Sequence, residues 1–366
     1  MTAGQVSPTA GLVLEGESAP VAVPADVDNV DDRFLRAALG LPGVTRLAAE
    51  QVGIGHMSDT YRLTLSGAPW PELILKINST DPDSRMTAIR HRTYEIEVGF
   101  YQLVAPHVDV RIPTCHWAGF EPRDGRYAIL LESVTGTRTG DQIIGCSPDE
   151  AAGALAELAP LHAQWWGDRS LAHLPWMRRY ENGYRAANLT RAQVGLPDFL
   201  ARFTDRLSPE AAELTESFAG QIHRYDRRGL AGPRTVGHGD FRADNLLFGQ
   251  HRVCLIDWQT TFLGNGLVDV SYFLGGSLTV SDRREHEKEL VRGYHERIVR
   301  AGVQLSWEEC WRTYRRHSFE GLAMALVAAP AVKRSSRGDD MFAVMTERAC
   351  QHVLDMAAGE LLDPPS

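Results

Sequence analysis

Cysteine is scarce in this sequence of 366 residues, and no two of its five cysteines lie close together in the chain. A zinc site would show cysteines at short spacing, and a small secreted disulfide framework would show an even number of them. Neither pattern is present, so we expect reduced, mostly buried thiols in a cytoplasmic protein. The cysteines are Cys115, Cys146, Cys254, Cys310 and Cys350.

Long apolar segments and a secretory leader are missing as well. The longest apolar run, residues 321–332, is shorter than the roughly 20 residues that a membrane-spanning helix needs. The first residues show neither the basic stretch nor the apolar stretch of a signal peptide. We therefore expect a cytoplasmic location and no membrane partner.

Basic charge is in deficit, with 38 Lys and Arg against 47 Asp and Glu and a formal net charge of -9. A general nucleic-acid-binding protein usually carries a basic surplus or patch, so we expect no nucleic-acid partner. The acidic balance is compatible with a cationic small molecule. A composition of 43% hydrophobic and 23% charged residues is typical of a soluble globular protein.

The chain is long enough for two or three domains, and it contains no internal repeat. Residues 1–28 are rich in small residues and proline without a helical period, so we expect a disordered leader there. Residues 29–134 have mostly strand-like patterns with one main helix, whereas residues 135–366 have mostly helical patterns. A stretch rich in glycine and threonine marks the boundary between the two domains.

The polar loop from His238 to Asn245 is where the sequence most clearly indicates chemistry. Asp240 and Asn245 precede an apolar segment, and a second apolar segment ends at Asp257. If these segments pair as a hairpin, Asn245 and Asp257 meet and offer the oxygen ligands that Mg²⁺ prefers. Asp240 can then orient a substrate hydroxyl and accept its proton. The alternative is that Asp240, Asp244 and Asn245 are turn formers only, since Asp and Asn are common in turns.

A second candidate feature is a small-residue turn between two strand-like segments. Gly53 and Gly55 lie in this turn, and Ser58 stands where a third glycine is missing. A tip without bulky side chains lets backbone N–H groups approach the oxygens of a triphosphate. The alternative is an ordinary hairpin turn.

Lys76 interrupts an apolar strand expected over residues 73–77. An isolated charge is costly to bury, so this lysine needs either a partner or a surface position. The helix expected over residues 86–103 offers Glu95 and Glu97, and Glu97 lies close to the apolar stripe that packs on the sheet. A pair between Lys76 and Glu97 would direct the ammonium group toward a phosphate.

Aromatic residues are available to line an acceptor pocket. A helix expected over residues 147–166 carries His162 and Trp165, and Trp176 and Tyr180 follow in the chain. Packing in the core is the default interpretation for the histidine and the tryptophans.

Together these features resemble the protein-kinase-like fold, because they occur in its order along the chain. His238–Asn245 is similar to the catalytic loop of the small-molecule branch, which has His-Gly-Asp, and Ile256–Trp258 stands at the metal-binding Asp-Phe-Gly of protein kinases. Leu131–Val134 resembles the hinge between the lobes, and Leu158–Gly167 looks most like the ecdysteroid-kinase-like group. The resemblance spans roughly residues 45–330. The small-molecule branch that the sequence resembles also contains the aminoglycoside phosphotransferases and the choline kinases.

This resemblance implies an α+β, bilobal fold: a small antiparallel-sheet lobe with one main helix, over residues 29–134, that binds nucleotide, and a larger, mostly helical lobe over residues 135–366. The helical lobe would hold the catalytic loop and the acceptor site. Asp240 would be the catalytic base or hydroxyl-orienting group, and Asn245 and Asp257 would bind Mg²⁺.

The same resemblance assigns the nucleotide contacts. Lys76, paired with Glu97, would contact the α- and β-phosphates of ATP. Backbone groups at Glu132 and Val134 would hold the adenine. The residues that would cover the phosphates are Gly53, Gly55 and Ser58.

We thus expect an ATP- and Mg²⁺-dependent phosphotransferase acting on a hydroxyl of a small molecule. Arg242 is a further candidate contact for the acceptor or the γ-phosphate, and Asp269 either stabilises the start of a helix or braces the loop behind Asp240. Two alternatives stay open: a non-catalytic nucleotide-binding scaffold, and a metal-dependent phosphohydrolase that uses His238. The acceptor and the oligomeric state are not predicted.

Overall fold

The structure is a computed structural model that describes residues 21–54, 57–168, 170–179, 184–229, 233–330 and 334–362. The described chain divides into two compact units. The N-terminal unit contains residues 21–108, 112–135 and 170–177, and the C-terminal unit contains nearly all of the rest.

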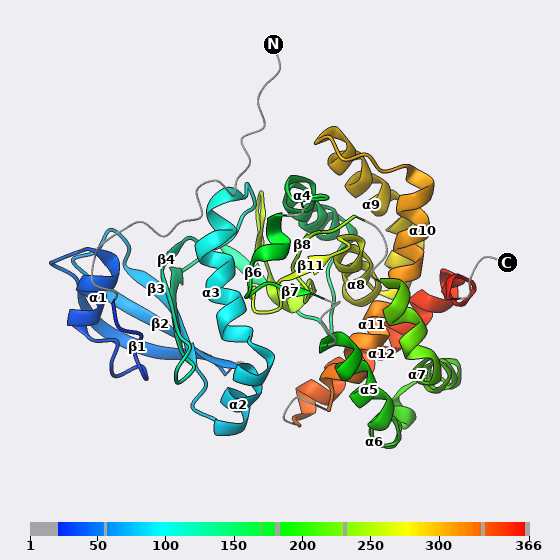
Figure 1. Cartoon of the computed structure of the whole chain (residues 1–366), viewed down its shortest axis with the longest axis horizontal. Helices are drawn as coiled ribbons and strands as arrows, with labels where there is room; N and C mark the ends of the chain where they lie inside the picture. The colour runs from blue at the N-terminus through cyan, green and yellow to red at the C-terminus, as the bar shows by residue number, and fades with distance from the viewer. Residues whose placement is uncertain are drawn as a thin grey trace, which may run out of the picture. The chain divides into compact units, whose positions relative to one another are not determined.

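A five-stranded antiparallel sheet forms the centre of the N-terminal unit, with strand order β1-β2-β3-β5-β4 (Figure 1). Burial alternates along β3, the pattern of a strand with one face on the core, whereas the middle of β5 is buried throughout. The strands are β1 Thr45–Ile54, β2 Ser58–Ser66, β3 Glu72–Asn78, β4 Cys115–Glu121 and β5 Arg126–Glu132. The hairpin expected around the two glycines is therefore confirmed, because β1 pairs with β2.

Three helices accompany this sheet: α1 Asp32–Leu39, α2 Pro82–His91 and α3 Thr93–Leu103. The expectation of a single helix over residues 86–103 is wrong. Arg92 adopts a left-handed conformation (φ 58°), which ends α2, and its guanidinium then binds Glu95 in the first turn of α3.

The core of the N-terminal unit lies between the sheet and α1. Leu63, Leu73 and Leu75 from the strands pack with Phe34 and Leu35 from α1. The burial of these apolar side chains supplies the main stabilisation of the layer.

Residues 21–28, which the sequence places in a leader, lie along this unit. Arg126 donates a hydrogen bond to the Val23 carbonyl at 2.9 Å, and Arg46 donates one to the Val27 carbonyl at 2.6 Å. Residues 1–20 of the expected leader lie outside the described residues.

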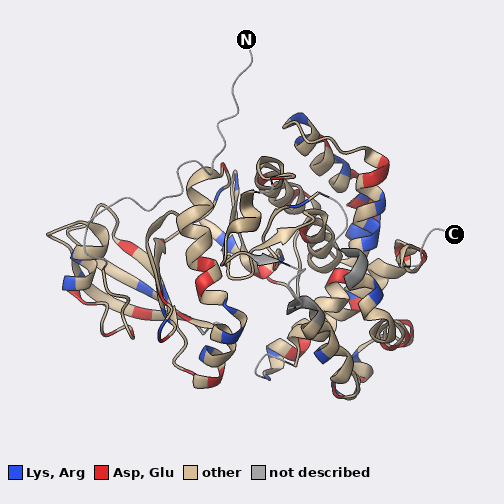
Figure 2. Ribbon diagram, in the orientation of Figure 1, with Lys and Arg blue, Asp and Glu red and all other residues tan. Residues whose placement is uncertain are grey.

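Helices dominate the C-terminal unit. Its centre is α8, all eleven residues of which are buried, and α9, α10, α11 and α12 pack around it. The helices are α4 Pro148–Gln164, α5 Tyr184–Val194, α6 Leu196–Phe203, α7 Pro209–Gly229, α8 Leu267–Ser277, α9 Val280–Arg300, α10 Trp307–His317, α11 Phe319–Ala328 and α12 Ser336–Asp355. Figure 2 shows acidic residues at the start of α10 and basic residues at its end, the distribution that a helix dipole favours.

Two small sheets in this unit carry the ends of the polar loop. One has the order β10-β9-β6 and the other β7-β11-β8. Their strands are β6 Thr137–Thr139, β7 Arg178–Arg179, β8 Thr235–Gly237, β9 Leu246–Gly249, β10 Val253–Leu255 and β11 Phe262–Gly264. The antiparallel pairing of β9 with β10 confirms the hairpin expected after the loop.

The expected α+β class is confirmed, with an antiparallel sheet in the N-terminal unit and mostly helices in the C-terminal unit. None of the helices within the described ranges is long and apolar enough to span a membrane.

Candidate active site

The polar loop runs from the end of β8 to the start of β9, and its backbone is held by a buried carboxylate. Asp269, in the first turn of α8, accepts the N–H of His238 at 2.6 Å and the N–H of Gly239 at 2.9 Å. Of the two roles expected for Asp269, bracing the loop is confirmed by these contacts, and its place in the first turn of α8 also suits the start of that helix. Gly239 has φ 83°, and a Cβ on it would lie 2.3 Å from the Thr260 carbonyl oxygen, so only glycine fits there.

The His238 ring is engaged at both nitrogens. Nε2 lies 2.9 Å from the Ile256 carbonyl oxygen, and Nδ1 accepts the Asp240 N–H at 3.3 Å. This pattern fits the neutral tautomer with the proton on Nε2. His238 therefore links the loop to the segment before Asp257, and this use of both nitrogens argues against a metal-ligand role.

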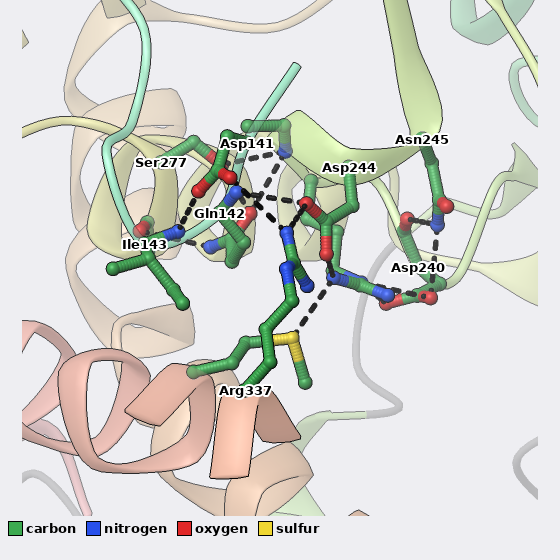
Figure 3. Close-up of polar contacts among 12 residues, drawn as sticks. Asp141, Gln142, Ile143, Asp240, Asp244, Asn245, Ser277 and Arg337 are labelled. Atoms are coloured by element: carbon green, nitrogen blue, oxygen red, sulfur yellow. Dashed lines mark hydrogen bonds and ion pairs between the residues drawn. The ribbon is translucent and has the colours of Figure 1, made fainter. Parts of the chain in front are cut away.

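Three side chains donate to the carboxylate of Asp240, and Figure 3 shows the contact from Asn245. The Tyr272 hydroxyl contacts Oδ1 at 3.1 Å, and Nδ2 of Asn245 contacts Oδ2 at 2.9 Å. Nε of Arg242 lies 3.1 Å from each oxygen. One cation and two neutral donors thus hold this carboxylate in position.

Arg242 points into the loop, where its Nη1 binds Asp244 Oδ2 at 2.6 Å in addition to the contact with Asp240. The expectation that it faces the acceptor or the γ-phosphate finds no support in these contacts. Asp244 is more than a turn residue, because it also accepts from the Gln142 N–H at 2.8 Å and from Arg337 at 3.4 Å (Figure 3).

The surroundings keep Arg242 and Tyr272 protonated. Burial acts to lower the pKa of the Arg242 guanidinium, but the charges of Asp240 and Asp244 outweigh it and hold that pKa above its ordinary value. Burial, followed by the negative charge of Asp240, raises the pKa of Tyr272 well above its ordinary value. Both groups therefore stay hydrogen-bond donors at neutral pH.

Asn245 contacts Asp240 through its amide nitrogen and not through its amide oxygen. Nδ2 donates to the Asp240 carbonyl at 2.8 Å and to the carboxylate at 2.9 Å, which uses both amide hydrogens. Both neighbours are acceptors, so the nitrogen must face them. No described residue donates to Oδ1, a hard oxygen of the type that Mg²⁺ binds.

Asp257 follows β10 at the same end of the hairpin. The Ile256 N–H donates to the Asn245 carbonyl at 3.1 Å, which extends the β9–β10 ladder up to Asp257. Asp257 has φ 68°, a left-handed conformation that costs roughly 1–2 kcal/mol for a residue other than glycine. The Gln259 amide donates to its Oδ2 at 3.2 Å. Backbone strain at a carboxylate that the sequence assigns to metal is consistent with a functional constraint.

The donor set fits a hard cation better than a transition metal. One carboxylate and one amide oxygen suit Mg²⁺, which keeps several waters and substrate oxygens as its other ligands. Over the part of the chain that the structure describes, no group of three or more His, Cys, Asp or Glu side chains is placed to hold a metal ion.

In the N-terminal unit, Lys76 and Glu97 form a largely buried ion pair. Nζ of Lys76 lies 2.5 Å from Glu97 Oε1, and the Tyr127 hydroxyl donates to Oε2 at 2.6 Å. Glu95 binds Arg92 instead, so the sequence alternative between the two glutamates is decided in favour of Glu97.

A tyrosine connects this ion pair to the hairpin after β1. Tyr94 stacks on Tyr127 with ring centroids 4.5 Å apart, and its hydroxyl donates to the Met57 carbonyl at 2.6 Å. Ser58, the next residue, is buried at the start of β2. Gly53 pairs with Thr60, whereas Gly55 lies outside the described residues.

The segment assigned to the adenine lies at the end of β5. The Glu132 N–H donates to the Thr114 carbonyl at 2.8 Å, so this N–H is already engaged within the N-terminal unit. Val134 is half-buried two residues further on.

The aromatic residues considered for the acceptor are mostly core residues. Trp165 and Trp176 are buried, and a Cβ on Gly99 would lie 2.4 Å from the Trp176 ring. His162 is fully buried and contacts Tyr294 at 2.8 Å. Tyr180 lies outside the described residues.

Sequence reasoning missed Tyr272 and Tyr127, whose hydroxyls support Asp240 and Glu97. Tyr127 lies in a strand, where nothing in the pattern indicates a partner on a helix. A signal for Tyr272 did exist, because Asp269 and Tyr272 are three residues apart and a helix places them on one face.

Solved structures show that the fold is widespread. A choline kinase from Cryptosporidium parvum matches with a TM-score of 0.58 at 11% identity, covering 90% of this chain and 95% of that one. An ethanolamine kinase from Plasmodium vivax matches with a TM-score of 0.55 at 9% identity, covering 87% and 86%. A macrolide 2′-phosphotransferase from Brachybacterium faecium matches with a TM-score of 0.50 at 16% identity, covering 86% and 97%.

Sequence comparison assigns the family. No curated protein sequence matches the chain. The phosphotransferase enzyme family matches residues 48–307, well over half of the chain. The chain therefore belongs to the phosphotransferase enzyme family and is a small-molecule phosphotransferase.

Proposed function

We propose that this phosphotransferase transfers the γ-phosphoryl group of ATP, with Mg²⁺, to a hydroxyl group of a small molecule. In this proposal Asp240 orients the acceptor hydroxyl, and Asn245 and Asp257 hold the metal. Lys76, fixed by Glu97, contacts the α- and β-phosphates.

The observation that carries the proposal is the orientation of Asn245. Its two amide hydrogens are directed at Asp240, which leaves the amide oxygen for a cation. One short loop thus supplies a carboxylate for the acceptor and an oxygen ligand for the metal. Phosphoryl transfer asks a protein chiefly for such positioning and charge stabilisation.

The residues of the chain have distinct tasks in the transfer. The acceptor oxygen forms a bond to the γ-phosphorus, the bond from that phosphorus to the β-phosphate oxygen breaks, and ADP leaves. Asp240 accepts the hydroxyl proton in this step, and three donors hold its carboxylate in position. Mg²⁺, when bound, would neutralise charge on the phosphate oxygens.

The N-terminal unit supports the nucleotide part of the proposal. Glu97 and Tyr127 fix Lys76 next to the β1–β2 hairpin, since Lys76 pairs with Thr60 of β2. Ser58 and the glycines at the end of that hairpin would cover the phosphates, and Glu132 and Val134 would contact the adenine.

The chemical class of the acceptor is the least specific element of the proposal. Proteins with this fold include, by their names, a macrolide 2′-phosphotransferase, a choline kinase and an ethanolamine kinase. A fold does not fix a substrate, so the acceptor is proposed only as a small molecule with a free hydroxyl.

The proposal is tested by measuring ADP release from MgATP over a panel of macrolides, aminoglycosides, choline and ethanolamine, followed by mass spectrometry of the acceptor. We expect at least one acceptor to gain a phosphoryl group, and chelation of divalent metal to abolish the gain. Phosphorylation that continues at an unchanged rate after chelation would contradict the metal assignment. ADP release that no acceptor accelerates above the rate with water alone, without any phosphorylated acceptor, would contradict the hydroxyl assignment.

A further inference from the structure

Helix α8 contacts the catalytic loop through two residues on one face. Asp269 binds the backbone N–H groups of His238 and Gly239, and Tyr272 binds the side chain of Asp240. Residues three apart in a helix lie side by side, so one helix face fixes both the path of the loop and its carboxylate.

The three donors to Asp240 constrain its carboxylate differently. Arg242 Nε lies at 3.1 Å from both oxygens, so this contact does not distinguish them. The Tyr272 hydroxyl binds Oδ1 alone, and the Asn245 amide binds Oδ2 alone among the carboxylate oxygens. Rotation about the last side-chain bond of an aspartate has no sharply preferred angle. A donor that binds one carboxylate oxygen and not the other fixes this angle.

Asn245 and Arg242 belong to the same loop as Asp240. Tyr272 comes from a separate element, the buried helix α8, and connects the carboxylate to it. A second contact joins the same two elements, because Phe273 packs on Phe241 of the loop with ring centroids 4.8 Å apart. Ser271 also donates to the Tyr314 carbonyl at 3.1 Å, which anchors α8 to α10.

We propose that Tyr272 is a positioning residue of the phosphotransferase, whose buried hydroxyl sets the orientation of the Asp240 carboxylate toward the acceptor hydroxyl. This inference rests on the proposed role of Asp240. Tyr272 does not touch the reacting atoms and acts through Asp240 alone.

The ionisation of Tyr272 agrees with this role. Burial and the charge of Asp240 raise its pKa well above the ordinary value, so the hydroxyl remains a donor over the working pH range. A buried tyrosine hydroxyl also needs a hydrogen-bond partner of its own. A purely structural tyrosine would satisfy that need without affecting turnover. The experiment therefore measures whether loss of the hydroxyl changes the turnover rate.

The test compares Tyr272→Phe with Tyr314→Phe, a matched control. Tyr314, in α10, is also fully buried. Its hydroxyl contacts Glu287 at 2.5 Å and His352 at 3.1 Å, and neither residue belongs to the catalytic loop. Both changes keep the ring and remove one hydroxyl. The probe is MgATP with water as the acceptor, measured as ADP release, together with the melting temperature of each variant.

We expect Tyr272→Phe to lower kcat by at least about tenfold with an unchanged KM for MgATP, because small misplacements of a catalytic group are costly. Tyr314→Phe should leave kcat within about twofold, the difference expected when no group at the reaction centre moves. In an Asp240→Asn background, Tyr272→Phe should cause no further loss, since its effect passes through Asp240.

Two results overturn the inference. If Tyr272→Phe turns over at the wild-type rate while Asp240→Asn is inactive, the positioning role fails and the proposed function stands. The positioning role also fails, and the proposed function stands, if Tyr272→Phe lowers the residual rate of Asp240→Asn by the same factor as it lowers the wild-type rate. If Asp240→Asn is as active as the wild type, the proposed role of Asp240 fails, and the inference fails with it.

Discussion

Asn245 donates both hydrogens of its side-chain amide to Asp240, one to the backbone carbonyl at 2.8 Å and one to the carboxylate Oδ2 at 2.9 Å. The two residues that the proposal assigns to metal and acceptor are therefore a single hydrogen-bonded unit. A change at either one affects the position of the other.

Replacement of Asn245 by alanine should raise the Mg²⁺ concentration needed for half-maximal activity by at least about tenfold, because a ligand oxygen is lost and Asp240 loses a donor. The measurement is a Mg²⁺ titration of ADP release at saturating ATP. Asn188→Ala in α5, whose amide oxygen binds Arg191 at 2.7 Å, is the control and should leave the titration unchanged. An Asn245→Ala enzyme with the wild-type Mg²⁺ requirement would remove Asn245 from the metal site.

Lys76→Met should lower the free energy of unfolding by about 3 kcal/mol, because it leaves the buried Glu97 carboxylate without its cation. Adding Glu97→Gln should recover much of that loss, since the uncompensated charge is then removed. Urea unfolding of the full chain measures both effects.

Glu95→Gln is the control for this pair. Glu95 forms a more exposed pair with Arg92, and the change should alter stability by about 1 kcal/mol or less. A double variant at Lys76 and Glu97 that is less stable than Lys76→Met alone would contradict the account of the buried pair.

Asp269→Asn should both destabilise the chain and slow turnover. The His238 N–H that Asp269 accepts is buried and the Gly239 N–H is half-buried, and an asparagine offers one oxygen where the carboxylate offers two. The expected loss is about 2 kcal/mol of unfolding free energy, the cost of a buried donor without a partner. Thermal unfolding measures the loss of stability, and ADP release measures the slower turnover. An unchanged melting temperature would show that the contacts of Asp269 with the loop do not stabilise the fold.

The sequence was sufficient for the local features that depend on spacing. The β1–β2 hairpin and the β9–β10 hairpin follow from alternation and turn residues. For Lys76, the cost of burying a charge left a surface position or a partner open, and the structure shows the pair with Glu97. These rules act over short stretches or between neighbouring elements.

The features that were not predicted depend on single backbone angles or on distant contacts. Arg92 interrupts the expected helix by adopting φ 58°, which no periodicity reveals. Asp244 was interpreted as a turn residue because its partners Gln142 and Arg337 lie far away in the chain. Tyr272 was missed although its spacing puts it on the same helix face as Asp269, because its partner Asp240 lies far away in the chain.

Acidification should remove a stabilising contribution from Glu287 in α9. Burial acts to raise its pKa, but His352 and Arg283 outweigh it, so the pKa in the folded chain lies below the ordinary value. A carboxylate with a lowered pKa stabilises the fold above the unfolded pKa of about 4.3, and this contribution is lost as the pH falls below it.

The difference in melting temperature between the wild type and Glu287→Gln should therefore be largest near pH 7 and shrink below about pH 4. Thermal unfolding of both proteins across this range is the measurement. A difference that is constant with pH would show that the charge of Glu287 contributes nothing.

The most direct test of the central claim is the rate of phosphoryl transfer from MgATP to the acceptor identified in the panel, compared between the wild type and Asp240→Asn. Mass spectrometry of the product reports the transfer, and equal melting temperatures would show that both proteins are folded. We predict that Asp240→Asn lowers the rate roughly 10²- to 10⁴-fold, the usual contribution of a positioned acid–base group. Transfer at the wild-type rate in a folded Asp240→Asn protein would contradict the account.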